Sequence, residues 1–525
     1  MSDGSADAVV IGAGPNGLIA ANMLADRGWE VVVCEEQPTP GGAVRSGEVT
    51  APGFVHDLYS AFYPLTAASR YVRPLELESY GLRWRSARGV VAHPHSDGRC
   101  ALLSMDLQET CASLDRFAAG DGDGWRRLFA LWRRAGPHLV GALLTPLPPL
   151  RPAGGLLRAV GPRGALEVAR LALLPARRLA DETFRGEGGG WLLAGNALHA
   201  DLTPDSAGGG LFGLVLCGLG QQHGYPVAEG GSGAITAALL ARLRDRGGEV
   251  LCGTPIERIE LGEGRARAAL AADGRRFAAR RAILADCGAP ALYEKMLPPD
   301  AVPQARRASL HNFQYDNSTF KVNWALRGPI PWAAEDARQA STVHVADGMG
   351  DLSRTTVQLA ERGIPDRPFL VLGQYSMVDD SRAPAGAETA WAYTHVPQQP
   401  AWDAAGELAG EWAGEDAQRF ADRIEGEVER RAPGFRELIL ERNVQSPLDL
   451  EANNRNLVGG AINGGTAQLY QQALFRPLAS LGRPTTPVRG LYLASSSAHP
   501  GGGLHGGPGG NAATTVIRHS RLRII

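Results

Sequence analysis

Three glycines near the start of the chain, Gly12, Gly14 and Gly17, have the spacing of a phosphate-binding turn. In the pattern Gly-x-Gly-x-x-Gly, a tight turn lets the backbone approach a diphosphate, and free N–H groups at a helix N-terminus face its negative charge. Glu35 follows 18 residues after Gly17, where a carboxylate can accept hydrogen bonds from ribose hydroxyls. These residues predict a dinucleotide site. The alternative is a glycine turn in an ordinary strand–helix–strand unit.

The surrounding sequence predicts the elements that such a site needs. Asp7–Ile11 is a short apolar run, typical of a buried parallel strand. The Ala-rich stretch Leu18–Arg27 predicts a helix that ends at Gly28, and Trp29–Cys34 predicts a second buried strand. The sequence therefore contains, in the required order, every element of a dinucleotide site: strand, glycine turn, helix, strand and acidic residue.

Two further glycine-rich segments could bring backbone against a flat or anionic group. A glycine doublet, Gly41-Gly42, follows the acidic residue closely; taken alone, it could also be a flexible turn. Near the C-terminus, a predicted strand at Val488–Ala494 leads into a glycine-rich loop at 495–511 and a predicted helix at Ala512–Arg521. A strand, a glycine-rich loop and a helix again provide an anion site.

Together these motifs resemble those of the glutathione-reductase-like flavoproteins, a superfamily that includes amine oxidases and phytoene desaturases. The C-terminal loop is similar to the signature of the phytoene desaturase family, above all of its phytoene dehydrogenase-related branch. Tyr225–Gly233 and Arg280–Pro290 also resemble segments of that branch, so the resemblance covers most of the chain. It implies FAD as the cofactor, held by Gly12, Gly14, Pro15, Asn16, Gly17, Glu35, Glu36, Gly41, Gly42, Arg45, Ile256, Asp286, Ser495, Pro500, Gly501, Gly502, Gly503, Asn511 and Ala512.

The resemblance also implies an α/β fold in which an α+β substrate domain is inserted into a Rossmann-type FAD-binding domain, as in amine oxidases and phytoene desaturases. Because motifs far apart in the sequence must converge on one flavin, we expect the FAD-binding domain to be discontinuous. We assign to it residues 1–70, 221–299 and 446–525, and to the substrate domain residues 71–220 and 300–445.

The substrate domain is expected to contain a mixed sheet. Alternating apolar residues at Ser318–Leu326, Pro368–Tyr375 and Thr389–Val396 predict three of its strands. Residues 402–432 predict one or two helices that end at Pro433-Gly434.

The segment His138–Leu179 is rich in Leu, Pro and Arg, with Arg and Leu at roughly helical spacing. This pattern predicts amphipathic helices that form a lid over the substrate cavity at about residues 125–185. Such a face could also touch a membrane and admit an apolar substrate. The sequence favours the alternative, a solvated helical face over an ordinary core.

The chemistry is expected to come from the flavin, with the protein supplying the pocket and the orientation. Only one complete dinucleotide fingerprint occurs in the sequence, so we expect O₂ or a quinone, rather than NAD(P)H, to reoxidise the flavin. By resemblance, the reaction is dehydrogenation (desaturation) of a C–C bond in an apolar or polyene-like small molecule, with hydride transfer to flavin N5. The alternatives are a flavin amine oxidase and a non-redox FAD-dependent isomerase or binding protein.

A catalytic base is required only if the substrate C–H bond is activated. The candidates are His505 in the C-terminal loop, His395 on a predicted strand and His199 after a glycine-containing turn. For each, a hydrogen bond to backbone or a place in the pocket wall is the alternative. Lysine occurs only at Lys295 and Lys321. Some amine oxidases use a lysine near the flavin, but the position of Lys321 favours a strand-surface residue.

Composition narrows the possible partners. The 53 basic and 55 acidic residues leave a net charge of −2, which provides no general attraction to nucleic acid. The six cysteines form no CxxC pair and no His/Cys spacing typical of a metal site, so no metal is expected. We see no signal peptide and no run of about 18 apolar residues. We therefore expect a cytoplasmic protein and leave open peripheral membrane contact and a homodimer.

Overall fold

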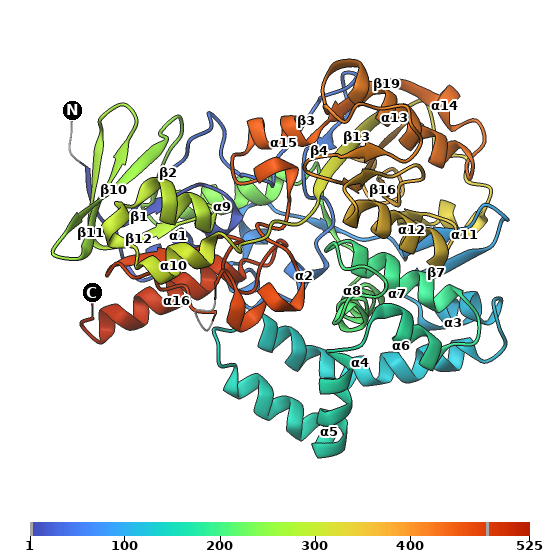
Figure 1. Cartoon of the computed structure of the whole chain (residues 1–525), viewed down its shortest axis with the longest axis horizontal. Helices are drawn as coiled ribbons and strands as arrows, with labels where there is room; N and C mark the ends of the chain where they lie inside the picture. Colours follow the sequence, from blue (N-terminus) through green and yellow to red (C-terminus); the bar gives the residue numbers. More distant parts are fainter. Residues whose placement is uncertain (1–3, 479–481, 525) are drawn as a thin grey trace.

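The computed structural model describes residues 4–478 and 482–524. Within these residues, two seven-stranded sheets form the centre of the molecule. Figure 1 shows the sheet that contains β1 (Gly4–Ile11) at one end of the long axis and the sheet that contains β13 (Ser318–Leu326) at the other, with a group of helices below the second sheet.

The first sheet has the strand order β10, β11, β12, β1, β2, β9, with β20 paired to β12. Besides β1, its strands are β2 (Val31–Cys34), β9 (Glu249–Leu251), β10 (Ile256–Gly262), β11 (Arg265–Ala271), β12 (Arg276–Ala285) and β20 (Leu491–Leu493). β1 runs parallel to β2 and β12, and Ile11 at its end pairs with both Cys34 and Ala285. The carboxyl ends of these strands therefore meet at one edge, and the glycine motifs follow them.

Helices α1 (Pro15–Ala25), α9 (Gly233–Asp245) and α16 (Gly507–Arg521) pack together beside this sheet. The predicted α/β fold with a Rossmann-type sheet is confirmed, and the first predicted strand, helix and strand are present within a few residues of their expected ends. The strands of the sheet come from residues 4–34, 249–285 and 491–493, which the sequence assigns to the FAD-binding domain. The domain boundaries themselves stay a prediction.

The second sheet has the order β19, β13, β17, β16, β14, β6, β7. Besides β13, its strands are β6 (Gly89–Pro94), β7 (Cys100–Ser104), β14 (Ala340–Val345), β16 (Leu370–Gln374), β17 (Glu388–Val396) and β19 (Ile439–Gln445). Neighbouring strands are antiparallel except for the parallel pair β6 and β14. The three strands predicted here from alternating apolar residues are confirmed as β13, β16 and β17.

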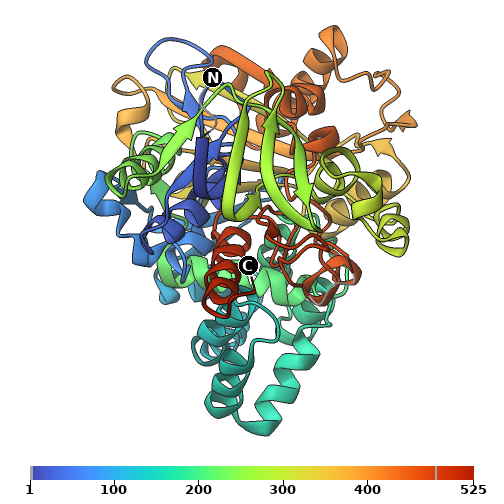
Figure 2. The same ribbon diagram turned by 90° about the vertical axis from the view of Figure 1, so that its left-hand side faces the viewer.

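A helical layer covers one face of the second sheet. It contains α3 (Leu107–Asp115), α4 (Asp121–Leu143), α5 (Leu150–Leu171), α6 (Ala176–Thr183), α7 (Gly188–Leu198) and α8 (Gly209–His223). In Figure 2, α4 and α5 project from the lower end of the molecule. Several apolar side chains in this region are exposed. On α5 and just after it they are Leu150, Leu157, Leu166 and Leu173; on a loop nearer the C-terminus they are Leu469, Tyr470, Leu474 and Phe475. Lid action and membrane contact at this face stay predictions.

The prediction of helix throughout residues 402–432 is wrong at its start. Helix α13 spans Gly414–Glu429, whereas Trp402–Asp403 forms a short strand, β18, beside β15 (Gly363–Ile364). Gly406 and Gly410, between them, have positive φ angles, which an α-helix does not contain. Within residues 4–478 and 482–524, none of the helices has the length and apolar character needed to cross a membrane.

The remaining elements are short or lie outside the two sheets. They include α2 (Pro64–Ala67), α10 (Gln304–Leu310), α11 (Glu335–Arg338), α12 (Met349–Ala360), α14 (Phe435–Leu438) and α15 (Pro447–Asn453), and the two-stranded pairs β3 (Ser46–Gly47) with β4 (His56–Asp57) and β5 (Trp84–Arg85) with β8 (Val227–Ala228).

Candidate functional site

A groove lies at the carboxyl edge of the first sheet, where the loops after β1, β12 and β20 converge. The predicted cofactor residues that line it are Gly14, Pro15, Asn16, Gly42, Asp286 and Ser495. Asn454, Asn456, Ser496 and Ser497 line it too, and the sequence analysis missed them. The polar run 453–456 was the available signal for the two asparagines, because such a run without apolar periodicity is typical of a loop.

The groove fits the diphosphate of a dinucleotide. A Cβ added at Gly14 would lie 2.8 Å from Asp286 Oδ2, and one added at Gly42 would lie 3.0 Å from the Gly14 Cα, so the wall has no room for side chains. Gly42 also has a φ of +55°, which glycine adopts without strain. Asn16 Oδ1 is buried and has no hydrogen-bond partner in the described residues. Bare backbone and the free N–H groups of a helix N-terminus are what a bound diphosphate would use, and the unpaired Asn16 oxygen could accept from a hydroxyl of the nucleotide.

Other predicted cofactor residues build the walls behind the groove. Glu35 accepts hydrogen bonds from the Ala13 N–H at 2.7 Å and the Gln37 N–H at 2.9 Å, and burial raises its pKa. Its backbone oxygen accepts the Thr254 N–H at 2.7 Å, which brings the start of β10 at Ile256 close to it. Glu36 pairs with Arg455 at 3.1 Å. Contact of these residues with the nucleoside stays a prediction.

The carboxyl group of Asp286 lies at the N-terminus of α1. Its Oδ2 accepts the Gly17 N–H at 2.8 Å. Asn456 holds the following backbone, since its amide nitrogen donates to Asp286 O and its oxygen accepts the Gly288 N–H, both at 3.0 Å. Burial, with a smaller contribution from the charge of Glu35, raises the pKa of Asp286 to about 7, against the opposing effect of the Gly17 hydrogen bond. The groove therefore contains a carboxyl group that titrates near neutral pH.

Asp286 should make FAD binding depend on pH. Below pH 7 the carboxyl is mostly protonated; above pH 7 its charge repels the diphosphate, so FAD affinity should fall by up to about tenfold per pH unit. Asp286→Asn can still accept the Gly17 N–H but carries no charge, so its affinity should stay level. Titration of both proteins with FAD at pH 6, 7 and 8, followed by flavin fluorescence, tests this. A level profile for the natural protein, or the same slope in Asp286→Asn, would contradict it.

A buried arginine that the sequence analysis missed shapes the C-terminal glycine loop. Arg476 is fully buried, and its guanidinium donates to backbone oxygens at four residues: Asn463, Gly465, Thr466 and Ser496. Burial lowers its pKa to about 10. A Cβ added at Gly501 would lie 3.1 Å from the guanidinium carbon, so this glycine packs directly on it. Arg476 thus ties the loop before β20 to the loop after it.

The last two predicted cofactor residues lie inside α16 rather than in the groove lining. Asn511 accepts a hydrogen bond from the Tyr71 hydroxyl at 2.6 Å and donates to His499 O at 3.3 Å, and Ala512 is fully buried. Both residues fix the position of the helix. Pro500 packs against Gly507 at its start, and Gly502 and Gly503 line an adjoining cavity.

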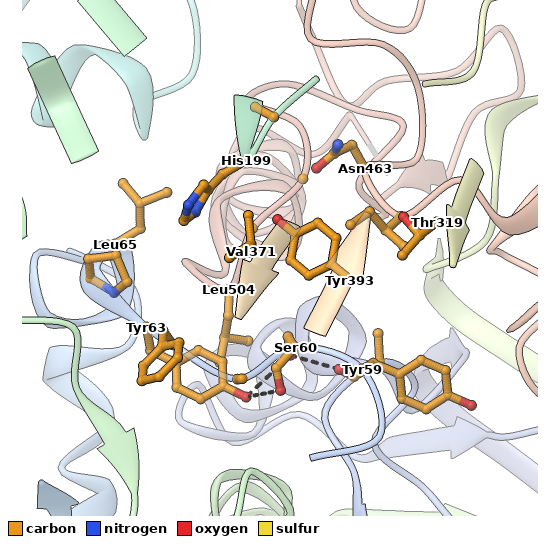
Figure 3. Close-up of a pocket in the computed structure, with 18 of the residues that line it drawn as sticks. Tyr59, Ser60, Tyr63, Leu65, His199, Thr319, Val371, Tyr393, Asn463 and Leu504 are labelled. Carbon is orange, nitrogen blue, oxygen red and sulfur yellow. Dashed lines mark hydrogen bonds between the residues drawn. The ribbon is translucent and has the colours of Figure 1, made fainter. Parts of the chain in front are cut away.

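That cavity has a volume of about 250 Å³ and shares Ala43, Leu457 and Ile462 with the groove. Because side chains alternate along a strand, one face of the second sheet forms one wall, with Thr319 and Lys321 of β13, Trp391 and Tyr393 of β17 and Val371 of β16. The segment 59–65 forms the facing wall (Figure 3). The cavity therefore lies between the two sheets, next to the cofactor groove.

Lys321 connects the two walls, and the expectation of a surface lysine is wrong. Its side chain is buried, and Nζ donates to the backbone oxygens of Asp57 and Tyr59, the second at 3.2 Å. Burial lowers its pKa to about 7, against the opposing effect of Asp57. Nζ also lies 5.2 Å from the centre of the Trp391 ring. The lysine holds the segment 57–59 against the sheet, and sequence alone could not show which face of the strand it occupies.

Of the three candidate histidines, His199 alone lines the cavity within the described residues. Its Nε2 lies 2.7 Å from Nε2 of His344, a buried residue of β14. His395 contacts Leu198 O through Nε2 at 3.0 Å and packs edge-on against Tyr393, behind the lining. Burial lowers the pKa of His199 to about 3, which makes it a weak base. A catalytic role for His199 or His395 stays a prediction.

His505 serves the glycine loop through both of its ring nitrogens. Nδ1 accepts the Gly507 N–H at 2.9 Å, so Nε2 carries the proton that it shares with Gly502 O at 3.0 Å. No ring nitrogen is then left to accept a proton from a substrate. This geometry favours the backbone-bonding alternative for His505 over a role as base.

Comparison with known proteins agrees with this arrangement. The pattern of the family described as "Flavin containing amine oxidoreductase" matches residues 16–508. The chain is 28% identical to "Pyridine nucleotide-disulfide oxidoreductase domain-containing protein 2" of Rattus norvegicus, over 98% of this chain and 93% of that protein. It is 25% identical to the "Phytoene desaturase (lycopene-forming)" of Pseudescherichia vulneris, over 95% and 96%.

Solved structures show the same fold at low sequence identity. A putrescine oxidase variant superposes with a TM-score of 0.62 at 16% identity and covers 99% of both chains. The family match runs from the first glycine turn to the C-terminal glycine loop, which are the segments that line the groove, so FAD is the cofactor that the groove accommodates. The chain belongs to the flavin-containing amine oxidoreductases and is an FAD-dependent oxidoreductase.

Proposed function

We propose that the protein dehydrogenates a C–C bond of a compact, largely apolar molecule held in the cavity between the two sheets. The observation that carries this proposal is the lining of the cavity, which is mostly apolar and aromatic and directly adjoins the cofactor groove. Apolar walls with a few polar groups are typical of small-molecule sites. The similarity to phytoene desaturases, at about 25% identity, supports the same class of reaction.

The size of the cavity favours a small substrate. The cavity has a volume of about 250 Å³. Pockets for drug-sized ligands range upward from about 300 Å³. A compact ring system fits this space better than an extended polyene.

The charges around the cavity disfavour a cationic amine as substrate. None of the described residues that line it is acidic, and Lys321 is its one ionisable cation of the Lys or Arg type. A positively charged amine would be repelled by a protonated Lys321 and would find no carboxylate to pair with. This argues for dehydrogenation of a neutral molecule over amine oxidation.

The chain's residues would orient the substrate and keep water out. When bound, FAD supplies the acceptor for a hydride. Residues 59–65 and the sheet face with Trp391 would enclose the substrate in the cavity, which shares Ala43, Leu457 and Ile462 with the groove. The Lys321 hydrogen bonds keep the two walls in register. The final electron acceptor, O₂ or a quinone, stays a prediction.

Anaerobic mixing tests the proposal. FAD-loaded protein is mixed with compact cyclic terpenes and terpene ketones in one series and with primary amines in another, and the visible absorbance of oxidised flavin is followed. We expect bleaching in the first series and none in the second. Bleaching by amines, with hydrogen peroxide formed in air, would establish the amine oxidase alternative. A bound flavin that no member of either series reduces would support a non-redox role.

A further inference from the structure

The polar groups of the cavity are not evenly spread. The wall formed by residues 61–65 and α8 is apolar, with Phe62, Leu65, Phe212 and Leu216. The opposite side has polar groups that no other residue in the described chain satisfies. In Figure 3, the Tyr393 hydroxyl points to the space between His199 and Asn463. A ligand in the cavity would therefore meet an apolar side and a polar side.

Thr319 is the clearest of these unsatisfied groups. It is 4% exposed, lines the cavity, and its hydroxyl has no hydrogen-bond partner among the described residues. Burial of an unpaired hydroxyl is unfavourable, and valine, which has almost the same shape, would avoid that cost at this strand position. The Thr319 hydroxyl is explained if a molecule bound in the cavity forms a hydrogen bond with it.

Tyr393 adds a second unpaired hydroxyl from the neighbouring strand. Its register partner on β13 is Lys321, two residues after Thr319 and on the same face of the sheet. No hydrogen bond to its hydroxyl occurs in the part of the chain that the structure describes. Burial raises the pKa of the phenol, so Tyr393 stays protonated and can donate.

The His199–His344 contact supplies a third donor. His344 Nδ1 is buried without a partner in the described residues. An N–H without an acceptor is rarer in protein interiors than an unpaired acceptor, so the proton of His344 belongs on Nε2, where it is donated to His199 Nε2 across 2.7 Å. The proton of neutral His199 is then on Nδ1, the ring nitrogen left for the cavity.

We propose that the substrate carries a hydrogen-bond acceptor oxygen, such as a ketone or aldehyde carbonyl, and that this oxygen binds on the polar side of the cavity, where Thr319, Tyr393 and His199 offer donors. The proposal rests on the proposed function and names the substrate class of the same site. Donors aimed at a carbonyl oxygen stabilise negative charge on it, so they would hold a polarised carbonyl more tightly than the matching hydrocarbon.

Binding of a matched ligand pair tests this without turnover. A cyclic hydrocarbon and the ketone of the same skeleton are titrated into FAD-loaded protein under anaerobic conditions, and the shift of the flavin spectrum gives each dissociation constant. We expect the ketone to bind at least about tenfold more tightly. Thr319→Val and Tyr393→Phe should each reduce this preference and leave hydrocarbon affinity equal or higher. Thr319→Ser, which keeps the hydroxyl, should retain the preference.

Thr342→Val is the matched control. Thr342 on β14 is also fully buried with an unpaired hydroxyl, but it does not line the cavity, so both affinities should stay unchanged. Equal affinity of the natural protein for both ligands, or a full preference in both Thr319→Val and Tyr393→Phe, would overturn the proposal. If the ketone preference is present but no ligand reduces the flavin, the acceptor site stands and the dehydrogenase function fails. If the flavin is reduced without any ketone preference, the dehydrogenase function stands and the acceptor site fails.

Discussion

Gly14→Val should yield a folded protein that is purified without its yellow colour. Gly14 has φ −69° and ψ 172°, which any residue can adopt, so the backbone need not change. The new side chain would enter the diphosphate groove, where its Cβ already lies 2.8 Å from Asp286 Oδ2. One or two charge-assisted hydrogen bonds between the diphosphate of FAD and the backbone of the groove would be lost, each worth about 1.5–3 kcal/mol. FAD affinity should fall about 100-fold or more, measured by FAD titration and by the ratio of visible to protein absorbance.

Gly350→Val is the control for adding the same side chain elsewhere. Gly350 lies in α12, and a Cβ there would meet no atom within 4 Å. This variant should bind FAD as the natural protein does. A Gly14→Val protein with full flavin content would show that the groove at the N-terminus of α1 is not the diphosphate site. Circular dichroism of both variants separates loss of cofactor from loss of fold.

Arg382→Met should strongly reduce the stability of the fold. The Arg382 side chain is fully buried and donates to Asp57 Oδ2 at 2.7 Å and Asp379 Oδ2 at 2.9 Å. Burial alone would raise the Asp57 pKa, but the charge of Arg382 and its hydrogen bonds lower it. Removal of the cation leaves buried carboxylates without a counter-charge, so the free energy of unfolding should fall by about 3–5 kcal/mol, measured by urea denaturation.

The loss of unfolding free energy in Arg382→Met should depend on pH, because the pKa of Asp57 is lowered in the natural protein. In the natural protein, the lowered pKa stabilises the fold above the ordinary Asp pKa of 3.8 and this contribution is lost as pH falls below it. In Arg382→Met the carboxyl can take up a proton at a higher pH, so the difference between the two proteins should shrink in acid.

Arg419→Met is the control for removing an arginine from an ion pair. Arg419 pairs with Glu415 at 2.6 Å, but both side chains are exposed, so the loss should stay below about 0.5 kcal/mol. An equal loss in both variants would contradict the role of the buried cluster. That cluster also bonds to Ser232 N and the Tyr375 hydroxyl, so Arg382→Met should loosen the contact of β4 with the segment after β16.

Local spacing in the sequence predicted the cofactor part of the site. The turn at Gly12–Gly17 and the buried strands on either side of it depend on neighbours along the chain, so their residue types reveal them. The same reasoning could not assign the histidines. His505 follows the glycine loop in sequence, but its two ring nitrogens bond to backbone at Gly502 and Gly507. Arg476 lies in no motif, and only the fold shows the four loop residues whose carbonyls it binds.

The sequence by itself determined a dinucleotide site between the parallel strands β1 and β2, because a phosphate-binding turn is a local feature of glycine spacing and strand polarity. The resemblance of its glycine motifs to those of flavoproteins implied FAD. The tertiary structure decided the cavity and its polar groups. Thr319 and Tyr393 come together only through the pairing of β13 with β17. The segment 59–65 faces them only because the chain before it packs on the second sheet, where Lys321 binds the backbone of Asp57 and Tyr59. Which face of a strand points into a shared cavity depends on contacts between residues far apart in the chain, and these are set by burial of apolar surface over the whole fold.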